Sequence, residues 1–347
     1  MKNYAYNGKP LTFKTEIYPD LIPYLGGINE NEYFTNIDAL IMSHKKQLEF
    51  IPSVFGDAVA PLNPAPAHLS YGHLVCIGAT IKYSETAEPN VTPTASSVEE
   101  AIEMLEKVRG MDFTKHPFFL YYVETLNRLR EAFPEREIAL TGFGHEGPIT
   151  SCALFRGQDF YMDLYDEPEL TKRYIYLMTE SICEFKKQLN VYNGLPPVTH
   201  YRGYLCDDCA SFLAPSMWEE FVIPYWEQYY SSLTTSKARF LHCESARREH
   251  LPFLAKAKIT HYQPSVSPML TLDDMKNYLP EGITFDWLLY AWELTKMTDE
   301  QIAAWIDAAV EAGAIIIRTQ FNSYTVKENK LDRVKAYLKA AEKYAID

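Results

Sequence analysis

Three neighbouring side chains that can bind a metal or move a proton follow a short apolar stretch in the second half of the sequence. The stretch Ala238–Leu241 leads directly into His242, Cys243 and Glu244. In an extended chain His242 and Glu244 would point to one side and Cys243 to the other, because side chains alternate along a strand. A histidine and a carboxylate on one side can hold a metal ion or transfer a proton. The alternative is a strand end that is polar only because it meets solvent.

Polar residues follow five further predicted strands in the same way. The C-terminal ends of parallel strands meet at one end of an α/β barrel, and active sites form there. Six successive polar strand ends are hard to assign to solvation alone, so the sequence predicts an enzyme. Besides the first cluster, these ends carry His145 and Glu146; Asp207 and Asp208, between Cys206 and Cys209; His261, Tyr262 and Gln263; Asp286 and Trp287; and Arg318, Gln320, Phe321 and Asn322.

A zinc site is one arrangement that these residues could form. His242, Glu244 and Asp207 would supply three nitrogen and oxygen ligands, and Asp208 is an alternative third ligand and a further catalytic candidate. Three protein ligands with one open position are typical of catalytic zinc. The alternatives are a hydrogen-bonded core histidine for His242 and a helix N-cap for the two aspartates.

The elements that must position these residues alternate between strand and helix from Ile138 to the C-terminus. That alternation predicts a parallel sheet with crossover helices, with roughly six such units in the second half of the chain. We therefore predict one (β/α)8 TIM barrel domain over residues 1–347, with a helical and β-hairpin decoration at its N-terminus. Residues 1–71 would hold this decoration and the first barrel elements. An open doubly wound sheet is the alternative.

The N-terminal half gives fewer clear signals. Residues 1–27 are irregular and interrupted by prolines. Strands are expected at Phe50–Phe55, Val75–Tyr83 and Ile138–Gly142, and a helix is expected after the capping sequence Ser97-x-x-Glu100.

The composition excludes several classes of partner. The 33 basic and 46 acidic residues give a formal net charge of −13, which argues against nucleic acid or an anionic membrane surface. The sequence shows neither a signal peptide nor an apolar run of about 18 residues. Six cysteines in 347 residues are too few for a disulfide framework, so we expect reduced thiols and a cytoplasmic location.

Several motifs, in order, resemble the uroporphyrinogen decarboxylase superfamily. The resemblance covers the chain from about Gly72 to the C-terminus and implies the barrel fold. Its motifs are Val75–Pro93, similar to the family's β-hairpin; Gly147–Gly157 running into Tyr165–Leu170; Asp207-Asp208 followed by Leu213–Phe221; and His242, which falls on the histidine of a His-x-Cys sequence in the methyltransferase branch.

The resemblance implies two chemistries, of which methyl transfer is favoured. Decarboxylases of the superfamily hold a porphyrinogen through an arginine-containing N-terminal stretch, whereas Tyr18–Gly27 is uncharged apart from Asp20. The methyltransferase branch works with corrinoid proteins, and some members bind zinc through His-x-Cys and a later cysteine. Here Glu244 stands at the cysteine position, and Gln320 and Phe321 lie where the last cysteine would fall.

These departures point away from thiol activation and towards an oxygen-linked methyl group. The resemblance therefore implies a methyltransferase that demethylates a methoxyaromatic compound and passes the methyl group to the corrinoid (cobalamin) of a partner protein, with zinc as a further candidate cofactor. Tyr262, Trp287 and Phe321 would sandwich the ring, unless they are ordinary packing residues. The remaining alternatives are another methyl donor such as methanol or a methylamine, methyl transfer to a thiol, and a decarboxylase. A homodimer is one candidate assembly.

Overall fold

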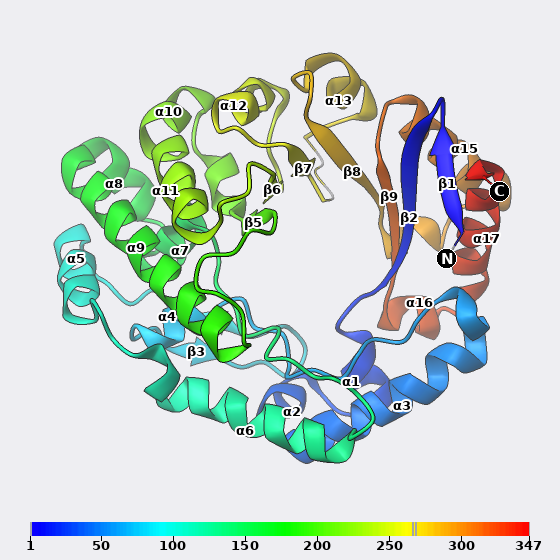
Figure 1. Cartoon of the computed structure of the whole chain (residues 1–347), viewed down its shortest axis with the longest axis horizontal. Helices are drawn as coiled ribbons and strands as arrows, with labels where there is room; N and C mark the ends of the chain where they lie inside the picture. Colours follow the sequence, from blue (N-terminus) through cyan, green and yellow to red (C-terminus); the bar gives the residue numbers. More distant parts are fainter. Residues whose placement is uncertain (1, 266, 268, 347) are drawn as a thin grey trace.

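A curved sheet of eight strands forms the centre of the computed structural model, which describes residues 2–265, 267 and 269–346. Its order is β10-β1-β2-β9-β8-β7-β6-β5, and the strands form an arc around the middle of the molecule (Figure 1). Six neighbours run parallel: β2 (Lys9–Ile17), β9 (Ile316–Phe321), β8 (Thr284–Leu289), β7 (His261–Gln263), β6 (Arg239–His242) and β5 (Gly203–Cys206). The strands β1 (Asn3–Tyr6) and β10 (Ala345–Ile346) are antiparallel at the edge.

Helices follow the parallel strands along the chain, which confirms the predicted barrel-type α/β fold. Helix α15 shows how sequence sets such a helix, because Thr298 and Gln301 form the expected capping box and Ile302, Ile306 and Val310 are buried. The helices of this half are α10 (Trp218–Phe221), α11 (Ile223–Leu233), α12 (Leu251–Lys256), α13 (Leu272–Tyr278), α14 (Ala291–Leu294), α15 (Asp299–Glu311), α16 (Ser323–Lys327) and α17 (Leu331–Ala341).

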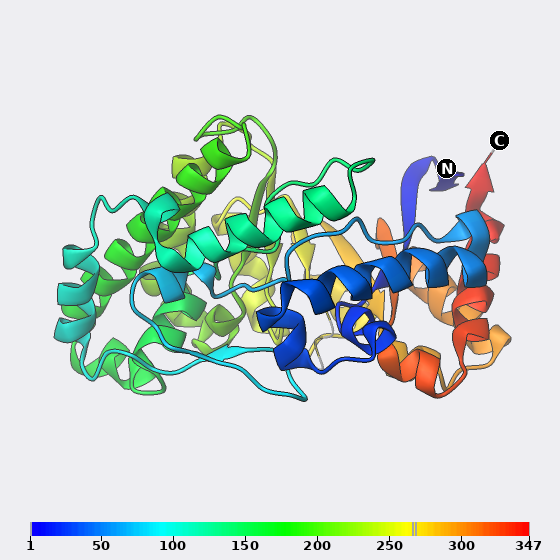
Figure 2. The same ribbon diagram turned by 90° about the horizontal axis from the view of Figure 1, so that it is seen from below.

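The N-terminal half covers the side of the molecule where regular strands are missing. Figure 2 shows α3 and α6 in front when the molecule is seen from that side. The elements here are α1 (Leu21–Gly26), α2 (Glu30–Thr35), α3 (Ile37–Phe55), α4 (Gly72–Cys76), the hairpin β3 (Ile81–Lys82) and β4 (Asn90–Val91), α5 (Val98–Lys107), α6 (Pro117–Ala132), α7 (Pro148–Arg156), α8 (Phe160–Asp166) and α9 (Pro168–Tyr192). In the described part of the chain no helix is both long and apolar enough to cross a membrane.

Three local predictions in this half were wrong in whole or in part. The stretch 1–27, predicted to be irregular, contains the hairpin β1–β2, and β2 pairs in parallel with β9. The predicted strand Phe50–Phe55 is the end of α3, where Ile51 and Phe55 are buried one helical turn apart. Val75–Tyr83 is only partly a strand: Val75 and Cys76 end α4, whereas Ile81–Lys82 forms β3, which pairs with β4 in the hairpin that the sequence predicts. A short apolar run does not by itself distinguish a strand from a buried helix turn.

The segment Ile138–Gly142, predicted to be a strand, is not a regular strand in the structure. Next to it, Leu69 bridges Phe143 in parallel. The backbone of Leu140 is instead satisfied by the side chain of Asn193, which accepts from the Leu140 N–H at 2.9 Å and donates to its carbonyl at 3.0 Å. Arg130 donates twice to the carbonyl of Ile138, at 2.9 and 2.7 Å. Side chains thus replace a strand neighbour.

Replacing Asn193 by alanine should therefore destabilise the fold. The buried N–H and carbonyl of Leu140 would both lose their partner, at a cost of roughly 2–3 kcal/mol in the free energy of unfolding. Urea denaturation measures this loss, and Asn277→Ala at an exposed position of α13 is the control. A loss no larger than that of the control would show that the side chain does not support this segment.

Candidate active site

His242 lies at the end of β6 and faces two carboxylates. Its Nδ1 is 2.6 Å from Oε1 of Gln263, at the end of the neighbouring strand β7. Its Nε2 is 3.6 Å from Oδ1 of Asp208 and 3.6 Å from Oε1 of Glu244. Cys243 is fully buried on the other side of the chain. The structure therefore brings His242, Glu244, Asp208 and Gln263 together, with the alternation that the sequence pattern predicts.

Asp207 has a different surrounding, although it is next to Asp208 in sequence. Its buried carboxylate accepts from the backbone N–H groups of Thr150 at 2.7 Å and Ile149 at 3.3 Å, in the first turn of α7, and from the indole N–H of Trp226 at 2.7 Å. Burial raises the pKa of Asp207 to about 6, against the opposing effect of these donors. A side chain at Gly147 would come within 2.5 Å of Asp207, so this close approach requires glycine. Asp207 therefore anchors α7 to the end of β5.

Asp208 begins the short helix η3 (Asp208–Phe212) and closes the cluster around His242. Its Oδ1 accepts from the backbone N–H of Glu244 at 2.7 Å, which fixes the carboxylate beside the histidine. The side chains of Asp208 and Glu244 are 38% and 44% exposed, whereas that of His242 is 16% exposed. The two carboxylates can therefore be reached from outside, and the imidazole lies just behind them.

A chain of buried polar side chains continues from Gln263 along the inner face of the strands. The amide N–H of Gln263 donates to Oδ2 of Asp286 at 2.8 Å, and Oδ1 of Asp286 is 2.6 Å from Nε2 of His261. Arg318, predicted to bind substrate, lies 3.2 Å from Asp286 and binds Glu16 on β2 at 3.0 Å. Its charge is thus already neutralised inside the protein. Gln320 lies beyond it and lines a cavity of about 420 Å³ together with Glu16 and Tyr18.

The three aromatic residues predicted to sandwich a ring lie on the opposite face of their strands. Tyr262 is fully buried and donates to the carbonyl of Cys243 at 2.8 Å. Phe321 is fully buried against Phe55 of α3, with 5.1 Å between ring centroids, and Trp287 packs beside the core. Each is one residue away from an inward-facing polar side chain, so the strand period of two turns it outward.

Three other aromatic residues, Tyr18, Tyr71 and Tyr290, lie near the carboxylates. Burial raises the pKa of Tyr18 and Tyr290, and the charges of Glu88 and Glu244 add to the shift. Burial, with the charges of Glu146, Glu88 and Asp208, raises the pKa of Tyr71 to about 12. Tyr18 and Tyr290 directly follow β2 and β8. The rule that found the other residues would have found both, had β2 been recognised and β8 been extended to Leu289.

Glu146 and His145 follow the irregular segment that ends at Phe143. Burial, with a contribution from the charge of Asp208, raises the pKa of Glu146 to about 8, although a hydrogen bond with Ser70 opposes the shift. Glu146 is therefore mainly protonated at neutral pH. Burial lowers the pKa of His145 to about 4, and this neutral ring contacts the Glu146 carbonyl at 3.0 Å. Glu146 belongs with the carboxylates near Asp208, and His145 supports its backbone.

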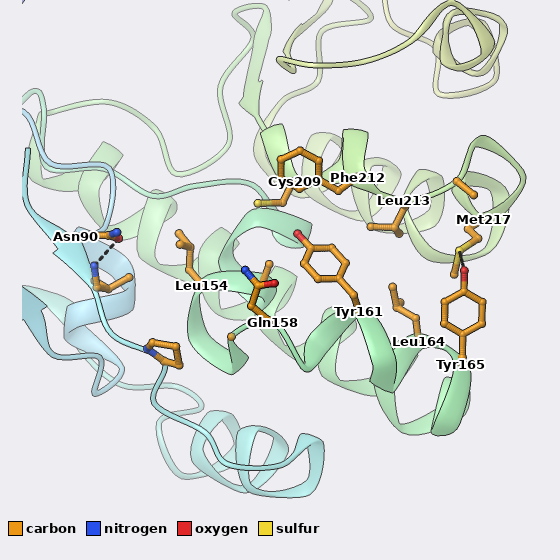
Figure 3. A pocket seen from close by; sticks show the side chains of 15 residues that line it. Asn90, Leu154, Gln158, Tyr161, Leu164, Tyr165, Cys209, Phe212, Leu213 and Met217 are labelled. Atoms are coloured by element: carbon orange, nitrogen blue, oxygen red, sulfur yellow. Dashed lines mark hydrogen bonds between the residues drawn. The ribbon is translucent and has the colours of Figure 1, made fainter. Parts of the chain in front are cut away.

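A separate apolar cavity of about 630 Å³ lies on the helix-facing side of η3 (Figure 3). Its wall is formed by α7, α8 and η3, and Tyr161 points toward Cys209 there (Figure 3). Burial raises the pKa of Cys209 to about 11, so this thiol is not an activated nucleophile. Cys209 directly follows Asp208 but faces the cavity, so the cavity is separated from the His242 cluster by the backbone of η3.

The predicted zinc ligands do not form a site. The carboxylate of Asp207 is held by three N–H donors of α7 and α11, whereas Asp208 is the aspartate placed beside His242. No group of three or more His, Cys, Asp or Glu side chains within residues 2–265, 267 and 269–346 is arranged to hold a metal ion. The cluster places Nε2 of His242 between the carboxylates of Asp208 and Glu244.

Comparison with known proteins supports the barrel and places the chain in a family. A methyltransferase from Methanosarcina mazei has a similar structure, with a TM-score of 0.68 and 16% sequence identity over 97% of this chain and 96% of that chain. A B12-independent methionine synthase from Shewanella sp. W3-18-1 in complex with selenomethionine gives a TM-score of 0.48 and 11% identity over 96% of this chain and 97% of that chain. No curated protein sequence gives a significant match. The uroporphyrinogen decarboxylase (URO-D) family matches residues 72–279, well over half of the 347 residues, and the chain belongs to this family.

Proposed function

We propose that this protein is a methyltransferase that removes the methyl group of a phenyl methyl ether and passes it to the corrinoid of a partner protein. The observation that carries the proposal is the His242 cluster at the end of β6, in which Nε2 faces Asp208 and Glu244 at 3.6 Å each. An ether oxygen is a poor leaving group unless it gains a proton or a Lewis acid. The cluster offers the proton.

His242 is the proposed proton donor. Its Nε2 lies 3.6 Å from Oδ1 of Asp208 and 3.6 Å from Oε1 of Glu244, at the opening where the leaving oxygen would arrive. When the carbon–oxygen bond of the ether breaks, the bonding electrons stay on the oxygen, which takes the proton from Nε2 of His242. General acids placed in this way contribute about 10²–10⁴-fold to a rate. No step in this proposal passes through a bound metal.

The ring of the ether would bind among the tyrosines near the carboxylates. Tyr18, Tyr71 and Tyr290 present flat apolar surface with polar tips, which suits a methoxyaromatic compound. A corrinoid, when brought by its carrier protein, supplies a reduced cobalt that accepts the methyl group. The exposure of Asp208 and Glu244, 38% and 44%, leaves the cluster open to such a partner.

The charges near the cluster argue against a polyanionic substrate. Asp208 and Glu244 face the opening, and Arg318 is neutralised by Glu16 and Asp286. A porphyrinogen would therefore find carboxylates where it needs cations. The same charges favour one second candidate, a methylated ammonium compound, because carboxylates and tyrosine rings bind such cations well.

A methyl-transfer assay separates these functions. We expect the protein to transfer methyl groups from methoxyaromatic compounds to free cob(I)alamin, seen as a change in cobalamin absorbance, and His242→Gln to be slower by about 100-fold or more. Transfer from methylammonium or tetramethylammonium salts without any from aryl ethers would favour the second candidate. Carbon dioxide release from an acid without cobalamin would overturn the proposal.

Substitution of Asp207 should mainly lower the stability of the protein, whereas substitution of Asp208 should mainly lower its activity. In Asp207→Asn an amide NH₂ would face at least one N–H donor, and we expect a loss of roughly 2–4 kcal/mol in the free energy of unfolding. Asp208→Asn keeps an oxygen for the Glu244 N–H, so stability should change by less than about 1 kcal/mol while methyl transfer slows about 10-fold. Urea denaturation and the absorbance assay measure the two effects. The reverse pattern would assign the catalytic role to Asp207.

Glu146 should make the stability of the protein depend on pH. Its pKa is about 8 in the folded protein against an ordinary value of 4.5, so between these values the folded state holds a proton that the unfolded state has lost. Stability should fall as pH rises through this window, by on the order of 3 kcal/mol. Urea denaturation at pH 5 and pH 8 should show a loss that is larger by this amount in the wild type than in Glu146→Gln, because Asp207, with a pKa raised to about 6, contributes to the loss in both proteins. The exposed Glu103→Gln should behave like the wild type, and an equal loss in Glu146→Gln would refute the assignment.

A further inference from the structure

The buried carboxylate of Asp286 has a fixed hydrogen-bonding role. Burial opposes its ionisation, but His261, whose Nε2 is 2.6 Å from Oδ1, and the charge of Arg318, 3.2 Å away, lower the pKa of Asp286. An ionised carboxylate has no proton to donate, so it only accepts hydrogen bonds. The group that faces Oδ2 at 2.8 Å must therefore be the NH₂ of the Gln263 amide and not its oxygen.

The orientation of Gln263 in turn fixes the proton on His242. Gln263 is 8% exposed, so water does not compete freely for its amide. With its NH₂ bound to Asp286, its oxygen lies 2.6 Å from Nδ1 of His242. An amide oxygen cannot donate, so the hydrogen of this bond belongs to Nδ1. A neutral imidazole carries one N–H, which leaves Nε2 with its lone pair.

We propose that Asp286 and Gln263 are positioning residues that hold His242 in the Nδ1–H tautomer, so that Nε2 is the atom that exchanges a proton at the opening. Nε2 is the nitrogen that faces Asp208 and Glu244 at 3.6 Å. After the imidazolium gives its Nε2 proton to a leaving oxygen, the remaining neutral ring is already in the tautomer that Gln263 accepts from. The opposite tautomer would place a hydrogen on Nε2 and a lone pair against the Gln263 oxygen.

The catalytic consequence rests on the proposed function, whereas the tautomer does not. In methyl transfer the imidazolium of His242 gives its Nε2 proton to the leaving oxygen and becomes a neutral ring with its hydrogen on Nδ1. In the opposite tautomer the lone pair would lie on Nδ1, next to the Gln263 oxygen, and not on Nε2 at the opening. The state of the ring can be read directly, without any substrate. The two ideas can therefore fail separately.

Nuclear magnetic resonance on the full chain labelled with ¹⁵N-histidine tests the tautomer. The His242 signals are identified by their loss in His242→Gln, and spectra are recorded at a pH where this ring is neutral. We expect Nδ1 to carry the hydrogen in the wild type. In Gln263→Met, which has a similar length and no acceptor, the hydrogen should move mainly to Nε2. Gln263→Glu, protonated on the oxygen that faces Asp286, keeps a donor to that carboxylate and a carbonyl acceptor for the ring, and should retain the Nδ1 hydrogen.

A matched control separates this effect from a general loss of stability. Gln188 of α9 is another partly buried glutamine with two hydrogen bonds, to the backbone N–H of Phe113 at 2.8 Å and the carbonyl of Met111 at 3.0 Å. Gln188→Met should lower stability and leave the His242 signals unchanged. A wild-type ring with its hydrogen on Nε2, or no change in Gln263→Met, would overturn the proposal.

Kinetics then test the consequence for catalysis. The rate constant kcat of methyl transfer should fall about 10-fold or more in Gln263→Met with little change in KM, and recover in part in Gln263→Glu. If the wild type transfers no methyl group but the spectra are as expected, the proposed function fails and the tautomer assignment stands. If the wild type is active and the spectra show Nε2–H, the positioning role fails alone.

Discussion

The buried carboxylate of Asp286 is the interaction on which the inner face of the sheet depends. An isolated buried carboxylate is costly, so it must be surrounded by donors and opposite charge. Those partners come from the strands on either side: His261 and Gln263 from β7, and Arg318 from β9. Arg318 passes the connection on to Glu16 of β2 at 3.0 Å. The charge of Asp286 therefore requires donors or cations at the neighbouring inward-facing positions of β7 and β9. It also occupies Arg318, which is then not available to bind a ligand.

Asp207 and Asp208 show how burial divides two identical side chains between structure and chemistry. Asp207 is completely buried, and its carboxylate accepts hydrogen bonds from three N–H donors of the protein. Asp208 has one strong donor, the N–H of Glu244, and stays 38% exposed. The first aspartate fixes where α7 meets β5, and this in turn fixes where η3 begins and where the second aspartate points. The anchor and the exposed group are therefore one unit.

Sequence predicted the C-terminal half of the fold well because polar residues lie near the ends of its strands and because capping sequences such as Thr298-x-x-Gln301 mark the start of a helix. The same rule located His242, Glu244, Asp208 and Gln263, which the structure brings together. It failed where a tertiary contact replaces a local signal. The segment at Leu140 is completed by a side chain from the end of α9, which no local pattern reveals.

The predictions of which side chains reach the opening failed for two other reasons. Side chains alternate along a strand, and the end of β8 lies two residues beyond the predicted end. Tyr262, Trp287 and Phe321 were assigned to the opening because they lie close to strand ends, yet the alternation of strand side chains turns them toward the helices. Tyr290 comes one residue after β8 ends at Leu289 and is close enough for the charge of Glu244 to act on it. Locating the site therefore depends more on where each strand ends than on how many strands are predicted.

Membership of the URO-D family fixes the fold of this chain but does not fix its substrate. The charges at the opening decide more. Burial, with a contribution from the charge of Asp208, raises the pKa of Glu146 to about 8, so this carboxyl group is mainly protonated at neutral pH. If Glu146 were ionised as well, three carboxylates would repel one another and any anionic ligand. A neutral or cationic methyl compound avoids this repulsion and gains from the tyrosine surface. The same argument explains why the buried Arg318 binds Asp286 and Glu16, since an arginine free at the opening would be drawn to Asp208 and Glu244 and would cancel the negative charge that favours a neutral or cationic compound there.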